Sequence, residues 1–192
     1  MHQNLLQAIS YFIDLSLEEK EFIMKSFKFK SLKKKEQLCS LGSISKEVYF
    51  VKSGLLRLYY LHKGNEITAF LFSENLFASA FPSFLEQKPS EQVLEALENT
   101  EVFFISKDNL EQLYKDVPKF NIVTRKLAEQ RFINAQRFFV SHLTQTPEER
   151  YRQFSQNFPD LIQRVPQHII ASFLGITPVS LSRIRNRKKK SV

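Results

Sequence analysis

The sequence predicts an α+β fold in which an N-terminal antiparallel β-barrel or jelly roll precedes a long helix and a C-terminal helix-turn-helix. Three observations predict it. Residues 35–105 contain short β-rich runs, the segment from Pro118 to Leu143 is periodic without internal glycine or proline, and residues 165–190 read VPQHIIASFLGITPVSLSRIRNRKKK. The expected domain boundaries enclose a β-rich domain (1–116), a long helix (117–144) and a helical C-terminal domain (145–192).

Short helices are expected at the N-terminus. Between Leu5 and Ser31 the apolar residues recur at helical spacing, first from Leu5 to Ile13 and then from Phe22 to Phe27. Ser16 is followed three residues later by Glu19, which is the spacing of a capping box. We therefore place the start of the second helix directly after Ser16.

Residues 35–105 have the composition and spacing typical of β-strands. The runs EVYFV, LLRLYYL, EITAFLF and EVFFI are rich in β-branched and aromatic residues, and Ser53-Gly54 and Lys63-Gly64-Asn65 separate some of them. Several short strands at even spacing are typical of a small antiparallel barrel or jelly roll.

The helical period returns at Lys107, and the helix from Pro118 to Leu143 carries too many apolar residues for one buried stripe. One stripe alternates steps of four and three residues, as a coiled-coil seam does. It consists of Ala128, Phe132, Ala135 and Phe139. We expect this seam to pair two copies in a homodimer; the alternative is a monomer whose helix is buried on two sides. Thr146, Pro147 and Glu149 then predict the start of a new helix.

The C-terminal segment predicts two helices joined by a tight turn. Pro166 suits the first turn of a helix that runs to about Leu174, and Gly175 suits a left-handed helix stop. Thr177 is placed to cap the next helix, with Pro178 in its first turn. Leu181 and Ile184 should face the first helix, where Ala171 permits a close crossing. This is the pattern of a helix-turn-helix.

The opposite face of the second helix carries groups that can read DNA. A guanidinium can bond guanine and a carboxamide can bond adenine, while hydroxyls and lysines hold phosphates. The candidate DNA-binding residues are Gln167, Thr177, Pro178, Val179, Ser180, Ser182, Arg183, Asn186, Arg187 and Lys188. A helical hairpin that merely packs, with a polar outer face, is the alternative.

The net charge and the cysteine content indicate an intracellular protein that binds polyanions. The net charge is +8, and residues 183–190 contain six basic residues and no acid. The single Cys39 cannot form an internal disulfide or an iron–sulfur ligand set. The first residues lack a basic stretch and a cleavage site, and no apolar run reaches membrane-spanning length. We expect a cytoplasmic location and no membrane partner.

The order of a barrel containing YFVKSGLLRLYY, a long helix and GITPVSLSRIR resembles the Crp/Fnr family of bacterial transcription regulators. The resemblance implies an effector domain of the cyclic-nucleotide-binding type, a homodimer paired through its central helix, and helix-turn-helix units that read a near-palindromic duplex DNA site. RNA polymerase and an unidentified small molecule are further candidate partners. An effector-binding module without DNA binding is the alternative function.

The resemblance also shows where this chain departs from cyclic-AMP-binding members, which carry Gly-Glu and Arg-Ser-Ala or Arg-Thr-Ala in a short cassette. Here Ala78-Ser79 and Ser90-Glu91 occupy those positions, and Ala135-Gln136 align with the Thr-Ser pair that contacts adenine. Lys88 is the only cation in the segment. We expect no conventional cyclic-AMP binding and leave the effector unidentified. The candidate effector-pocket residues are Phe77, Ala78, Ser79, Lys88, Ser90, Glu91, Ala135 and Gln136.

Two hypotheses remain for the effector domain: DNA binding without any ligand, or a response to a less charged, more apolar molecule. Phe77, Phe81 and Phe84 suggest the second, although they also suit a plain core. Enzyme chemistry is not expected, because no phosphate loop or nucleophile elbow occurs. Metal and haem sites are not expected either, since the histidines lack ligand spacing. They are His2, His62, His142 and His168.

Overall fold

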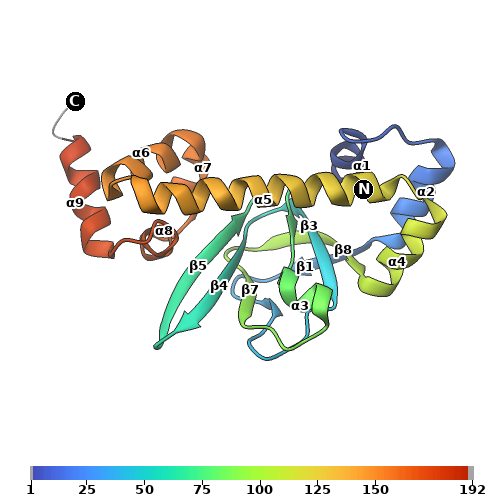
Figure 1. The fold of residues 1–192 in the computed structure, drawn as a ribbon, viewed down its shortest axis with the longest axis horizontal. Coiled ribbons are helices and arrows are strands. Elements are labelled where there is room, and N and C mark those ends of the chain that lie inside the picture. Colours follow the sequence, from blue (N-terminus) through green and yellow to red (C-terminus); the bar gives the residue numbers. More distant parts are fainter. Residues whose placement is uncertain (1, 190–192) are drawn as a thin grey trace. The chain divides into compact units, whose positions relative to one another are not determined.

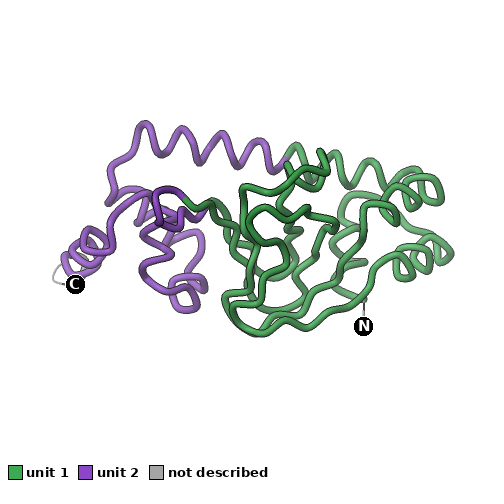
Figure 2. The backbone as a smooth tube through the Cα atoms, turned by 90° about the horizontal axis from the view of Figure 1, so that it is seen from below, with its two compact units in different colours: residues 1–61, 69–129 green, residues 62–68, 130–192 purple. Residues whose placement is uncertain are grey.

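The computed structural model describes residues 2–189, without the side chains of residues 188 and 189. The chain forms two compact units, which Figure 2 shows in different colours. The first comprises residues 1–61 and 69–129, and the second comprises residues 62–68 and 130–192. Among the described residues, none of the helices combines the length and the apolar character needed to cross a membrane.

The first unit contains most of a roll of two four-stranded sheets, and the connection of β4 to β5 at residues 62–68 belongs to the second unit (Figure 1). One sheet has the order β1-β8-β3-β6 and the other the order β2-β7-β4-β5, with antiparallel pairing between β1 and β8, β3 and β8, and β4 and β7. The strands are β1 (Lys28–Leu32), β2 (Gln37–Cys39), β3 (Glu47–Ser53), β4 (Leu56–His62), β5 (Asn65–Phe72), β6 (Phe77–Ala78), β7 (Gln92–Ala96) and β8 (Thr100–Ser106). The four predicted runs coincide with β3, β4, β5 and β8, except that Leu55 precedes β4, and the predicted fold class is confirmed.

Helices accompany the roll in the same unit. They are α1 (Gln3–Ser10), α2 (Leu17–Ser26), α3 (Phe81–Glu86), α4 (Lys107–Asp116) and the first part of α5 (Phe120–Thr144). The capping box before α2 is confirmed: the Ser16 hydroxyl accepts from Glu19 N at 3.2 Å, and Ser16 N donates to the Glu19 carboxylate at 2.7 Å. This pair satisfies two backbone donors that the helix end would otherwise leave open.

The first sheet begins earlier than the sequence indicated. Strand texture was expected from Lys35, but KFKSL at Lys28–Leu32 forms β1 and pairs with β8 from Lys28↔Phe104 to Leu32↔Thr100. Its side chains are mostly exposed because β1 is the edge of its sheet. The strand is therefore rich in polar residues and lacks the apolar run by which the other strands were predicted. The short helix α3 inside the strand block was also not predicted.

Two apolar clusters hold this unit together. One includes Val51, Leu58, Leu94 and Val102 from both sheets. The other joins α1, α2, α4 and the start of α5 to the outer residues of β3 and β8, including Phe50 and Phe103. Figure 1 shows these helices gathered at one end of the roll.

The second unit is mostly helical. After residue 130 of α5 it contains α6 (Pro147–Asn157), α7 (Pro159–Arg164), α8 (Gln167–Phe173) and α9 (Pro178–Lys189). The predicted capping box of α6 is confirmed, with Thr146 N donating to the Glu149 carboxylate at 2.8 Å. Phe173 packs against the rings of Phe138 and Phe154 and so ties α8 to α5 and α6.

Candidate functional site

Helices α8 and α9 meet in the tight turn that the sequence predicts. Helix α8 starts at Gln167, with Pro166 at its cap position rather than inside its first turn. Gly175 has φ +65°, a left-handed conformation that favours glycine. The Thr177 hydroxyl then accepts from Ser180 N at 3.1 Å and caps α9.

The crossing of the two helices is also as expected. Ala171 of α8 and Leu181 of α9 are fully buried, and Ile184 is 7% exposed. Small and apolar side chains at the crossing let the helices pack closely, so α9 presents its remaining face outward. The local geometry is that of a helix-turn-helix.

The outward face of this pair carries most of the candidate DNA-binding residues. Ser180 is half-buried, and its hydroxyl lies 2.9 Å from that of Thr177 in the helix cap. The side chain of Lys188 lies outside the described residues. The exposed members of the candidate set are Gln167, Thr177, Pro178, Val179, Ser182, Arg183, Asn186 and Arg187.

Arg187 and Arg183 border a hollow between α6 and α9. Its volume is about 220 Å³, and it is lined by Pro147, Glu148, Ser180, Arg183, Ile184 and Arg187. Arg187 forms an ion pair with Glu148 at 2.6 Å, and both side chains remain largely exposed. An acidic residue therefore lies among the basic groups of the candidate interface.

Arg150 of α6 positions the turn, a role that sequence reasoning missed. Its Nε donates to Leu174 O at 3.0 Å, and its Nη1 donates to Gln145 O at 2.7 Å. These carbonyls lie just beyond the ends of α8 and α5, where backbone acceptors need partners and a cation is favoured. The guanidinium thus links the end of the long helix to the turn of the helix-turn-helix.

His142 supports the same turn from α5. A side chain at Gly175 would come within 3.1 Å of the His142 ring. The ring is held in place by a 2.9 Å contact of Nδ1 with Phe138 O and by packing on the Phe138 ring. The close approach gives Gly175 a second reason to lack a side chain.

The predicted seam of α5 is largely uncovered within the chain. Phe132 is 64% and Phe139 63% exposed, Ala128 is exposed, and Ala135 is half-buried. Leu143 continues the apolar stripe at 69% exposure. Large apolar side chains at such exposure are characteristic of an interaction surface.

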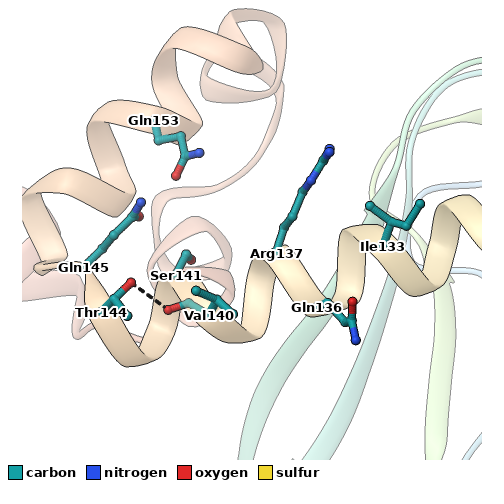
Figure 3. Close-up of a pocket in the computed structure, with 8 residues that line it drawn as sticks. All are labelled: Ile133, Gln136, Arg137, Val140, Ser141, Thr144, Gln145 and Gln153. Carbon is teal, nitrogen blue, oxygen red and sulfur yellow. Dashed lines mark hydrogen bonds between the residues drawn. The ribbon is translucent and has the colours of Figure 1, made fainter.

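A groove lies beside this stripe, between the second half of α5 and α6 (Figure 3). Its volume is about 460 Å³. Figure 3 shows Gln153 of α6 facing α5, while Arg137 extends away from the helix. The lining residues are Ile133, Gln136, Arg137, Val140, Ser141, Thr144, Gln145 and Gln153.

The serines at the cyclic-nucleotide cassette positions are buried and internally bonded. Ser79 donates to Glu47 O at 3.1 Å. Ser90 donates to Gln92 O at 2.8 Å and accepts from Gln92 N at 3.0 Å. Neither hydroxyl supplies the charge that a buried cyclic phosphate or ribose anchor provides, so these residues do not fit a conventional cyclic mononucleotide.

The remaining candidate effector residues are divided between the two units. Lys88 and Glu91 are exposed, and Lys88 pairs with Glu86 at 3.0 Å. Ala78 belongs to the core between the sheets, and Phe77 packs on the helical core together with Phe81 and Phe84. Ala135 and Gln136 belong to the second unit, where Gln136 lines the groove beside α5.

A buried cation that the sequence reasoning missed lies in β4 instead. The Arg57 side chain is 2% exposed, its Nη1 lies 3.4 Å from Glu95 Oε1, and its guanidinium stacks 4.3 Å from the Tyr59 ring centre. The signal in the sequence was an arginine inside the apolar run LLRLYYL. A charge in such a strand needs a partner on a neighbouring strand.

Comparisons with known proteins agree with this architecture. Residues 29–117 match the family described as cyclic nucleotide-binding domain. A search of curated proteins by sequence gives no match.

Solved structures are similar over most of the chain. The c-di-GMP-responsive global regulator CLP from Xanthomonas campestris has a TM-score of 0.73 at 15% identity, covering 92% of this chain and 93% of its own. FixK2 from Bradyrhizobium japonicum has a TM-score of 0.74 at 18% identity, covering 86% and 85%. A Crp/Fnr-family protein from Eubacterium rectale has a TM-score of 0.69 at 20% identity, covering 93% and 85%.

The family match at residues 29–117 coincides with the β-roll and α4, and the helices α5 to α9 follow it in the chain. Its fold is that of the Crp/Fnr transcription regulators, and the resemblance seen in the sequence is confirmed. Two of these similar structures, CLP and the Eubacterium rectale protein, are described as regulators.

Proposed function

We propose that the protein is a homodimeric transcription regulator that binds a near-palindromic duplex DNA site through α9. The observation that carries the proposal is the capped helix-turn-helix, whose recognition helix buries Leu181 and Ile184 and exposes Ser182, Arg183 and Asn186. Those three side chains have the donors and acceptors that read base edges in a major groove.

Dimerisation follows from the exposed seam of α5. Two copies of Phe132 and Phe139 would bury each other across a two-fold axis, which removes apolar surface from water. The dimer presents two recognition helices, and RNA polymerase is a candidate partner of the DNA-bound form. The domain boundaries we propose remain residues 1–116, 117–144 and 145–192.

The effector domain acts without a conventional cyclic mononucleotide. The hydroxyls of Ser79 and Ser90 donate hydrogen bonds to backbone carbonyls of the chain. The side chains of Phe77, Phe81 and Phe84 pack in the helical core. The packing of these phenylalanines weakens the hypothesis of an apolar effector. DNA binding without ligand is therefore the simpler proposal.

Selection of bound fragments from random duplex DNA, followed by affinity measurements over a range of salt, tests the function. Neutralising phosphates releases counterions, so affinity should fall steeply between about 50 and 200 mM salt. Enrichment of a near-palindrome supports the proposal. An absence of salt-dependent binding would favour the alternative, an effector-binding module whose C-terminal helices only pack.

A further inference from the structure

The strongest unassigned feature is the hollow between α6 and α9. Arg183 and Arg187 supply two cations on α9, and Ser180 adds a hydroxyl. The other wall is the first turn of α6, an 11-residue helix whose positive end is at Thr146 and Pro147. The Arg187 guanidinium, the Ser180 hydroxyl and the helix N-terminus together match the chemistry of a phosphate group, and Arg183 borders the same hollow.

Glu148 opposes this chemistry. It lines the same hollow and holds Arg187 at 2.6 Å, although it is not a member of the α6 capping box, which consists of Thr146 and Glu149. Exposed ion pairs contribute little to stability, and both side chains here are more than half exposed, at 76% for Arg187 and 55% for Glu148. A purely structural role therefore explains little of this pairing.

We propose that the hollow is a binding site for a DNA backbone phosphate and that Glu148 is its internal competitor. In the free protein the Glu148 carboxylate is paired with the Arg187 guanidinium. When the protein binds DNA, the guanidinium releases Glu148 and pairs with the phosphate. The competition lowers affinity for every sequence alike, because phosphate contacts carry no base information. The inference rests on the proposed function and identifies one of its contacts.

The test compares wild type, Glu148→Gln, Arg187→Gln and the double variant. Each binds the selected site and a random duplex at several salt concentrations. Glu148→Gln should tighten binding to both duplexes by about tenfold and steepen the salt slope by about one phosphate. Asp160→Asn is the matched control, since it removes the same charge from an exposed position in the first turn of α7.

The double variant separates the exchange from general repulsion. If Glu148 acts through Arg187, Glu148→Gln should have little effect in the Arg187→Gln background. Equal tightening in both backgrounds, or by Asp160→Asn, would overturn the exchange, and weaker binding of Glu148→Gln would show that the pair is structural. If wild type and all variants lack salt-dependent DNA binding, the proposed function itself fails.

Discussion

The guanidinium of Arg57 on β4 lies 3.4 Å from the carboxylate of Glu95, the residue directly opposite on β7. Arg57 is 2% exposed and Glu95 14%, so the pair has little contact with water. The desolvation cost of such a pair is offset only while both charges are present.

Glu95→Gln should therefore lower the free energy of unfolding by about 3 kcal/mol, because it removes the charge that compensates the buried guanidinium. Urea denaturation followed by circular dichroism measures this loss. Glu21→Gln breaks an exposed pair with Lys25 and should cost less than about 0.5 kcal/mol. Similar losses in the two variants would show that burial of Arg57 has no energetic consequence.

Gly175→Ala should destabilise the second unit for two reasons. The left-handed backbone at φ +65° costs about 1–2 kcal/mol for a residue with Cβ, and the methyl group would meet the His142 ring at 3.1 Å. Gly42→Ala has a similar φ of +77° with no atom nearby, so it measures the backbone cost alone. His142→Ala should relieve only the steric part, and a double variant no more stable than Gly175→Ala argues against the contact.

Phe132→Asp should convert the dimer to a monomer, because the interface would bury an unpaired charge. Sedimentation at micromolar concentration checks this. Leu17→Asp, at an 81% exposed position in the first turn of α2, should leave the assembly unchanged. A wild type that sediments as a monomer would contradict the proposed dimer.

Arg183→Ala should weaken binding to the selected site by about 1–3 kcal/mol and relax preference at one base pair, if its guanidinium bonds guanine. Replacing Lys188, Lys189 and Lys190 by glutamine should instead weaken all sequences alike and flatten the salt dependence. Competition binding with single-base variants of the site distinguishes the two effects. Unchanged affinity and an unchanged selected site for Arg183→Ala would refute this docking.

Cyclic AMP and cyclic GMP should give no saturable heat up to millimolar concentration, because Ser79 and Ser90 supply no charged anchors. Calorimetry and DNA binding with each nucleotide check this. Saturable heat with tighter DNA binding would contradict it. Loss of that heat in Lys88→Gln would then identify Lys88 as the phosphate anchor, after release from Glu86.

The elements that could be predicted correctly are those whose signals lie in neighbouring residues. Capping boxes at Ser16 and Thr146, the left-handed stop at Gly175 and the cap at Thr177 are each decided by a few neighbouring residues. The strands rich in apolar residues could also be predicted, because their apolar side chains are those buried in the core of the roll. The helix-turn-helix could be predicted because all its signals lie within one short segment.

Contacts between residues far apart in the sequence could not be predicted and depend on the folded chain. The edge strand β1 exists because β8 supplies its hydrogen bonds, and Arg57 is tolerated because Glu95 lies opposite it. Arg150 meets carbonyls that end two different helices, and Glu148 meets Arg187 across 39 positions of sequence. Such pairs produce no periodic pattern in the sequence, because the periodicity of each partner reflects only the helix or strand that contains it. The folding of the chain brings the two partners together.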